Sequence, residues 1–278
     1  MDAVKISAAD VKKLREQTGA GMMDCKKALT EAEGDFEKAI EILRKKGQKL
    51  SAKRADRNAT EGVVVAIVSE DKTSGVIVKL ACETDFVAKN EDFVNLAKSF
   101  ANIALETTPA DLNALLAQSY EGITISEKVT EQVGVIGEKI ELSAYEHISA
   151  AMVAPYIHMG YRAGVLVGLN KADNSFYDPG RDVAMQVAAM KPIAVNKDQV
   201  DDSVVKKEIE IGMEVARQQG KPEAMLEKIA MGKLNKFFKE NTLLNQAFVK
   251  DSKKNVGDYL KGFDGDLTVT EFKHVTLG

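Results

Sequence analysis

The feature that most constrains the fold is a pair of β-branched runs at residues 63–68 and 76–80, separated by a short polar segment ending in Gly75. Such runs predict two strands joined as a β-hairpin. A helical pattern opens soon afterwards at residues 90–92. Its apolar positions recur with helical spacing and form one continuous stripe: Phe93, Leu96, Ala97, Phe100, Ala101, Ala104 and Leu105. A hairpin followed by an amphipathic helix is typical of an α+β protein.

The second half of the chain repeats this order loosely. Strand-like stretches around residues 140–147 and 163–169 precede a helix that begins at Asp178-Pro179 and ends at Lys191-Pro192. Two long helical stretches, about 202–219 and 222–240, are joined by Gly220-Lys221-Pro222, which favours an antiparallel hairpin. A closing helix over 252–260 and a strand over 267–275 complete the chain. The sequence therefore predicts two tandem sheet-plus-helix subdomains with an antiparallel helical-hairpin (coiled-coil) insertion.

The N-terminal part predicts a small three-helix bundle of the UBA-like kind. Ser7 and Asp10 resemble a capping box at the start of the first helix. The glycines in Thr18-Gly19-Ala20-Gly21 break that helix, and Gly34 ends the second one. Gly47 is expected to end the third. Because so small a bundle has little core, we expect it to work as a docking module.

These patterns give four predicted segments. The bundle covers 1–47, a linker 48–60, a first core subdomain 61–144, and a second core subdomain 145–278 that carries the helical hairpin. The linker is polar and basic, with Lys53, Arg54 and Arg57 but no aromatic residue. This composition favours a solvated linker over a nucleic-acid patch.

Charge and targeting signals narrow the class of protein further. Lys and Arg total 38 against 42 Asp and Glu, so the basic excess of a phosphate-backbone binder is missing and we expect no direct nucleic-acid partner. The two cysteines, Cys25 and Cys82, give no disulfide framework and no zinc-ligand spacing. The start of the chain lacks a signal-peptide pattern, and the longest apolar run, around Ala163 to Leu169, is far too short for a membrane span. We expect a cytoplasmic protein without a membrane partner.

Signals of catalysis are scarce. The three histidines, His147, His158 and His274, have no metal-binding spacing, and there is no G-x-S-x-G element. Gly19-Ala20-Gly21 followed by Lys26 lacks the second glycine of a phosphate loop and follows a helix where a strand is required. We therefore expect no catalytic residue, no cofactor and no metal site, and we predict that the protein is not an enzyme.

Two short features stand out. Met22 and Met23 are adjacent at the start of the second helix, where side chains point about 100° apart. One methionine buried and one exposed is the simpler interpretation, and a flexible contact for a partner is the alternative. Thr84-Asp85-Phe86-Val87 lies where a strand passes into a helix. Thr84 or Asp85 could cap that helix with Phe86 as a hydrophobic staple, or Asp85 and Phe86 could form an exposed tip that enters a partner.

Two longer segments are distinctive: TGAGMMDCKKAL, which follows residues 14–17, and CETDFVAKN from Cys82. They closely resemble the two signatures of the elongation factor Ts family, the bacterial guanine-nucleotide exchange factors for elongation factor Tu. The likeness continues through residues 158–160 into GVLVGL, through residues 184–192, and through QGKPEAMLEKIAMGKLNKFF, so it covers nearly the whole chain. The resemblance implies a factor that binds elongation factor Tu in its GDP-bound and nucleotide-free states. It would disturb the magnesium and nucleotide site and promote GDP release so that GTP can bind during translation elongation.

The resemblance also implies roles for particular residues. The TDFV element is the wedge beside the partner's magnesium, and the bundle and two further elements dock on the partner. The residues concerned are Thr84, Asp85, Phe86 and Val87 for the wedge, and Met22, Met23, Lys26, Ile136, Gly137 and His158 for docking. The helical pair resembles the family's projecting coiled coil. The sequence leaves open whether two copies associate as a homodimer.

Two departures from the family pattern and two rival functions remain open. Ala81 stands where many relatives place Asn, and the sequence ends at Gly278, where some relatives carry a further helix; we expect weaker partner contact from the second departure. One rival is a helper enzyme that uses Cys82 with a histidine. The other is an adaptor whose bundle binds peptides or ubiquitin-like domains.

Overall fold

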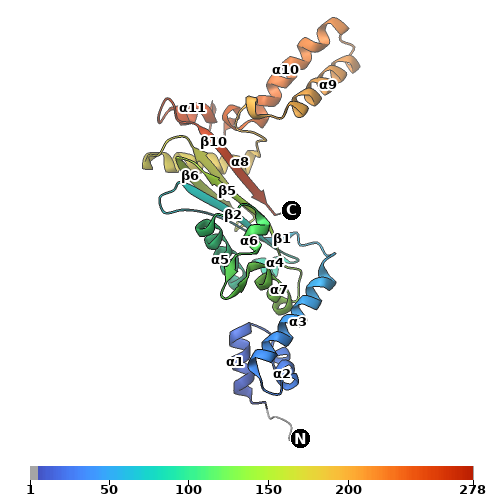
Figure 1. Ribbon diagram of the computed structural model, residues 1–278. Helices are drawn as coiled ribbons and strands as arrows, with labels where there is room; N and C mark the ends of the chain where they lie inside the picture. The colour runs from blue at the N-terminus through green and yellow to red at the C-terminus, as the bar shows by residue number, and fades with distance from the viewer. Residues whose placement is uncertain (1–5, 278) are drawn as a thin grey trace. The chain divides into compact units, whose positions relative to one another are not determined.

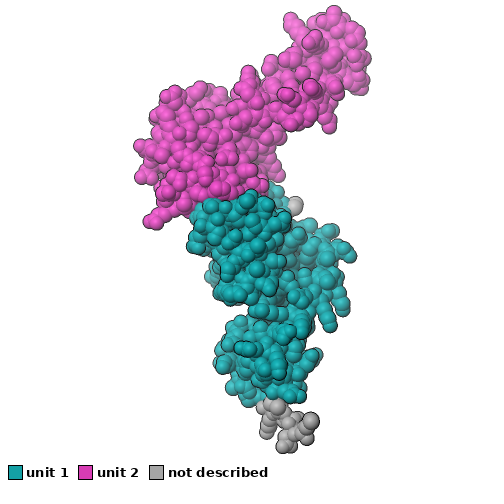
Figure 2. Space-filling model, viewed as in Figure 1, with its two compact units in different colours: residues 1–65, 78–145, 276–278 teal, residues 66–77, 146–275 magenta. Residues whose placement is uncertain are grey.

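The computed structural model describes residues 6–277 and divides into two compact units (Figure 2). Unit 1 comprises residues 1–65, 78–145 and 276–278, and unit 2 comprises residues 66–77 and 146–275. Helices and small antiparallel sheets alternate along the chain (Figure 1), which confirms the predicted α+β class. No helix in the described residues is long and apolar enough to cross a membrane.

Unit 1 begins with the predicted three-helix bundle, which comprises α1 (Ala8–Thr18), α2 (Met22–Glu31) and α3 (Phe36–Arg54). The capping box is present, because the Ser7 Oγ accepts the Asp10 N–H at 3.1 Å and the Asp10 carboxylate accepts the Ser7 N–H at 3.2 Å. The bundle core is small, as its length implies. It consists of Val11, Leu14, Ala20, Cys25, Ala28, Leu29, Ala32 and Ala39.

The third helix is longer than predicted. The expectation that Gly47 ends it is wrong, because α3 continues to Arg54 and takes in much of the predicted linker. Gly47 is instead a contact point with α7 (Ile125–Ile136): a Cβ on Gly134 would lie 2.9 Å from the Gly47 Cα. Two helices can approach this closely only where both lack side chains, so this glycine serves packing within a helix rather than helix termination.

The remainder of unit 1 and the adjoining strands follow the predicted hairpin-plus-helix order. Strands β1 (Glu61–Val68), β2 (Ser74–Cys82) and β5 (Glu141–Ser149) form a sheet in the order β1-β2-β5, and their residues are divided between the two units. The main helix of unit 1, α5 (Glu91–Thr107), buries the predicted apolar stripe from Phe93 to Ala104 and leaves Leu105 half-buried. The shorter elements are α4 (Asp85–Ala88), α6 (Leu112–Leu116), β3 (Ser119–Tyr120) and β4 (Ile123–Thr124).

Unit 2 contains a second sheet, in the order β10-β7-β6. Its strands are β6 (Met152–His158), β7 (Ala163–Leu169) and β10 (Val269–Thr276), and β6 pairs antiparallel with β7 from Met152↔Leu169 to His158↔Ala163. Helix α8 (Tyr177–Met190) packs on this sheet and completes a core with Val165, Val183 and Phe248. The smaller elements are η1 (Asn174–Phe176), η2 (Lys197–Gln199), η3 (Leu243–Asn245), β8 (Ala247–Phe248), β9 (Asp251–Asn255) and α11 (Val256–Lys261).

The end of unit 2 agrees only in part with the sequence prediction. The closing helix was expected to begin at Ser252, but residues 252–255 belong to strand β9 (Asp251–Asn255), and the helix α11 starts at Val256 with Asn255 as its N-cap. Strand β6 was not predicted. The helical hairpin is present as α9 (Asp202–Gln218) and α10 (Glu223–Asn241). The two helices approach closely at Gly212, where an added Cβ would lie 3.1 Å from the Ala230 Cα.

Candidate partner-binding site

The TDFV element forms a sharp corner in unit 1. Strand β2 ends at Cys82, and the four-residue helix α4 begins at Asp85. Thr84 is the N-cap by position, with extended backbone, but its side chain makes no capping hydrogen bond. No residue of α4 is buried, and the Phe86 side chain is 83% exposed. The interpretation of Phe86 as a hydrophobic staple is therefore wrong.

The acidic member of the tip is locally neutralised. The Asp85 carboxylate accepts a hydrogen bond from the Lys89 ammonium at 2.6 Å, one helical turn further on. This bond holds the pKa of Asp85 below its ordinary value, so the carboxylate is ionised at neutral pH. Val87 is half-buried beside the exposed phenyl ring. The corner thus presents an aromatic ring next to a carboxylate and an ammonium group.

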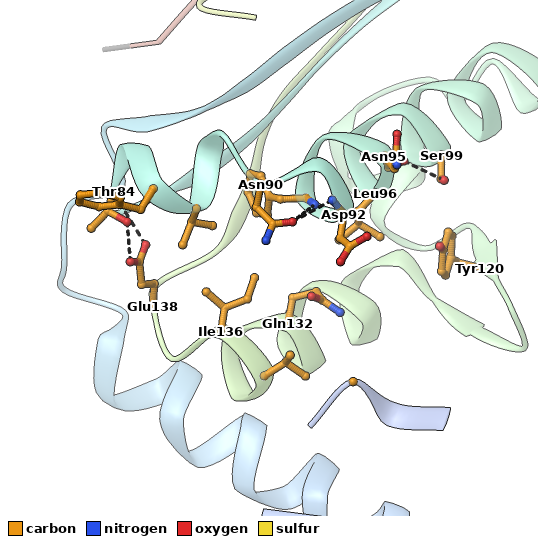
Figure 3. Close-up of a pocket in the computed structure, with 15 residues that line it drawn as sticks. Thr84, Asn90, Asp92, Asn95, Leu96, Ser99, Tyr120, Gln132, Ile136 and Glu138 are labelled. Carbon is orange, nitrogen blue, oxygen red and sulfur yellow. Dashed lines mark hydrogen bonds between the residues drawn. The ribbon is translucent and has the colours of Figure 1, made fainter. Parts of the chain in front are cut away.

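The second predicted contact, Ile136-Gly137, ends helix α7. Gly137 is the C-cap with φ at +82°, a left-handed conformation that favours glycine. A cleft of about 680 Å³ lies between α4, α5 and α7 of unit 1, and Ile136 and Phe86 both line it (Figure 3). The structure therefore brings the TDFV corner and the VIG segment to one surface.

The next residue, Glu138, connects these two segments. Its carboxylate accepts the Glu83 and Thr84 N–H groups, each at 3.1 Å, and the Thr84 hydroxyl at 2.6 Å. Figure 3 shows the two bonds between Thr84 and Glu138. Glu138 is not among the site residues predicted from the sequence. The available signal was its position directly after a C-capping glycine and within the VIGEK segment, but its partners lie 54 and 55 residues away in the chain.

The predicted docking residues of the bundle lie on the outside of α2. Met22 is 56% exposed and Met23 is 64% exposed, so the interpretation with one buried methionine is wrong. The buried face of this helix is formed by Cys25, Ala28 and Leu29. Lys26 is also exposed. Exposure is what a partner contact requires, and the docking role of these residues stays a prediction.

His158 belongs to unit 2, at the end of β6. Its Nδ1 atom lies 3.1 Å from the Tyr156 hydroxyl, and the side chain is half-buried. The turn that follows has three successive residues with positive φ, namely Met159 at 45°, Gly160 at 65° and Tyr161 at 71°. Such a conformation is unusual for residues other than glycine, and it leaves the Met159 side chain 71% exposed.

The described residues offer neither a metal-binding cluster nor a Cys82 thiol that is ionised at neutral pH. Within residues 6–277, no cluster of three or more His, Cys, Asp or Glu side chains could hold a metal ion. Burial, with the Glu138 charge, raises the pKa of the Cys82 thiol to about 12, and its Sγ donates to the Thr84 carbonyl at 3.2 Å. A thiol with so high a pKa is a poor nucleophile at neutral pH.

The fold defines an α+β protein with an N-terminal helical bundle, two small three-stranded sheets and a helical hairpin. The family model described as Elongation factor TS matches residues 83–278. The chain is 54% identical over 274 residues to the elongation factor Ts of Christiangramia forsetii, with 99% of each chain covered. It is 52% identical to that of Flavobacterium psychrophilum, covering 98% of this chain and 99% of the relative. For Amoebophilus asiaticus the identity is 53%, with the same coverage of the two chains.

The chain therefore belongs to the elongation factor Ts family, a family of translation elongation factors. This confirms the resemblance on which the sequence analysis relied.

Proposed function

We propose that this protein is a guanine-nucleotide exchange factor that acts in the cytoplasm and has no catalytic residues of its own. It binds GDP-bound elongation factor Tu, disturbs the magnesium and nucleotide site, and stays bound to the nucleotide-free form until GTP enters. The observation that carries this proposal is the solvent-exposed Phe86 on a four-residue helix, directly beside Asp85. Because the ring is exposed in the free protein, its burial against a partner would contribute favourable free energy to binding.

The free energy that exchange requires decides how many contacts take part. If the factor weakens the partner's affinity for nucleotide, then nucleotide must weaken the partner's affinity for the factor in the same ratio. A change of about ten-thousandfold needs roughly 5.5 kcal/mol of differential binding. Burial of one Phe side chain supplies only about 1.5–3 kcal/mol. Phe86 therefore acts with the docking contacts, which hold the partner in an open conformation.

The docking contacts are divided among three elements. Met22, Met23 and Lys26 on α2 bind the nucleotide-binding domain of the partner. Ile136 and Gly137 form a second contact beside the wedge residues, and they line or adjoin the same cleft as Phe86. His158 supports the contact from the end of β6. Methionine suits such a surface because its flexible, polarizable side chain adapts to a partner.

The rival hypothesis of an enzyme based on Cys82 is less well supported. A thiol whose pKa is raised to about 12 is almost entirely protonated at neutral pH, and Cys82 is buried. The adaptor hypothesis explains the exposed methionines but gives no role to the Asp85-Phe86 tip. A nucleic-acid patch in the predicted linker is also less well supported, because two of its basic residues, Arg54 and Arg57, form ion pairs with Glu83.

The release of a fluorescent GDP analogue from elongation factor Tu, followed by stopped flow, tests the proposal. The wild-type protein should accelerate release, and Phe86→Ala should slow the stimulated rate about ten- to a hundredfold, because about 1.5–3 kcal/mol of burial is lost. Phe263→Ala, which removes another exposed ring far along the chain, is the matched control and should leave the rate unchanged. An unchanged rate for Phe86→Ala would remove the wedge, and no acceleration by the wild type would refute exchange.

A further inference from the structure

The corner that carries Phe86 is not held by its own helix. With only four residues, α4 is not stable as an isolated helix, because the entropy lost in fixing the first turn exceeds the free energy gained from its hydrogen bonds. None of its residues is buried, and Thr84 provides no side-chain cap. The direction in which Phe86 points therefore depends on the segments that flank α4, of which Glu83 and Thr84 form the preceding one.

That preceding segment is fixed by Glu138. One carboxylate oxygen, Oε2, accepts both the Glu83 and the Thr84 N–H groups, and the other, Oε1, accepts the Thr84 hydroxyl. Hydrogen bonds to an ionised carboxylate are stronger than those between neutral groups. Three of them on two successive residues fix both the backbone and the side chain at the entry to α4.

The Glu83 side chain in turn binds the backbone next to Glu138. Its Oε1 atom accepts the Lys139 N–H at 2.6 Å, so each glutamate binds the backbone beside the other. The remaining donors to the Glu83 carboxylate are Arg54 and Arg57, each at 3.0 Å. Arg54 is the last residue of α3, so the same network joins the bundle's long helix to the corner.

We propose that Glu138 is a positioning residue for exchange. It contacts the backbone before α4 and not the partner, and it holds the Asp85-Phe86 tip at a fixed distance from Ile136-Gly137. The inference rests on the proposed exchange function and deepens it. A rigid tip enters the partner without the entropy cost of ordering the corner. The loss of Glu138 should therefore reduce the rate of GDP release from the factor-bound partner more than it reduces the affinity of the factor for the partner.

The test combines Glu138 and Phe86 substitutions in the full-length chain. GDP release from elongation factor Tu is measured as a function of factor concentration for Glu138→Ala, Phe86→Ala and the double variant. Glu138→Ala should lower the saturating rate about tenfold and change the half-saturating concentration by no more than about threefold. If Glu138 acts through Phe86, the double variant should release GDP at the rate of Phe86→Ala alone, within about twofold.

Further variants separate positioning from folding. Glu138→Gln keeps one acceptor oxygen and should give an intermediate rate, which also covers the case in which Glu138→Ala fails to fold. Glu141→Ala removes the same charge three residues away, where the side chain faces Lys139 instead, and should match the wild type. Amide hydrogen exchange at Glu83 and Thr84 should be faster in Glu138→Ala than in the wild type, whereas the exchange of α5 amides should be unchanged.

The outcomes distinguish the inference from the function beneath it. If the wild type and Phe86→Ala behave as expected but Glu138→Ala matches the wild type, the positioning role is wrong and exchange stands. Full additivity of the two substitutions would likewise overturn the positioning role, because independent contributions add. If the wild type does not accelerate GDP release at all, both proposals fail.

Discussion

The close approach of α3 and α7 makes a sharp prediction about one methyl group. Gly134→Ala places a Cβ 2.9 Å from the Gly47 Cα, well inside van der Waals contact. The obstructing atom is backbone, so it cannot rotate away and the two helices must separate. Gly232→Ala on α10 is the matched substitution, because a Cβ there meets no atom within 4 Å.

Two terms of opposite sign set the size of the effect. Replacing a mid-helix glycine such as Gly232 with alanine stabilises a helix by about 0.5–1 kcal/mol, and the gain at Gly134, in the last turn of α7, is no larger. Overpacking of a well-packed contact costs about 1–3 kcal/mol, and only Gly134→Ala incurs it. We therefore expect Gly232→Ala to raise the free energy of unfolding by up to about 1 kcal/mol and Gly134→Ala to lower it by up to about 2 kcal/mol.

Calorimetric unfolding of the two variants and the wild type measures these differences. Native-state hydrogen exchange adds the location, since only Gly134→Ala should loosen amides of α3 around Gly47. A Gly134→Ala variant as stable as Gly232→Ala would refute the close packing of α3 on α7.

Two further predictions concern titratable groups of unit 1. The Lys139 N–H, with Arg57 and Arg54, holds the pKa of Glu83 below its ordinary value of 4.5, so its stabilisation is complete above about pH 4.5 and is lost as pH falls through the lower folded value. Glu83→Gln should therefore flatten the fall of thermal stability below that pH, whereas Glu106→Gln at the exposed end of α5 should not; parallel acid profiles would contradict the network. For Cys82, a pKa of about 12 against an ordinary 9.0 predicts that its reaction with a disulfide reagent at pH 8 is on the order of a thousandfold slower than that of a free thiol until the chain unfolds. Rapid labelling of the folded protein would show that the thiol is accessible and ionised.

Local patterns were sufficient for much of the fold. The apolar stripe from Phe93 to Leu105 has the period of a helix and lies on α5 as expected. The capping box of Ser7 and Asp10 and the break between α9 and α10 depend on residues within one turn, so the sequence displays them directly.

Gly47 shows where such reasoning fails. A glycine near the end of an apolar pattern predicts a helix end, but the same residue also permits a second helix to approach closely. The choice depends on Gly134, which lies far along the chain and on another helix. Strand β9 fails for a related reason: its polar, lysine-rich residues have no strand pattern, and pairing with Ala247 and Phe248 decides their conformation.

In the candidate site, too, some residues can be recognised from local sequence and others only from contacts between distant parts of the chain. Phe86 is noticeable in the sequence because an aromatic residue directly after Asp85 has no place in the pattern of α5, and its exposure is a local consequence of a very short helix. Glu138 is not noticeable, because a glutamate after a glycine is ordinary and its three hydrogen bonds all reach across more than fifty residues. Under the proposed function, the residue that enters the partner is thus conspicuous in the sequence. The residue that would position it is recognised only in the fold, which brings the Glu138 carboxylate to backbone more than fifty residues away.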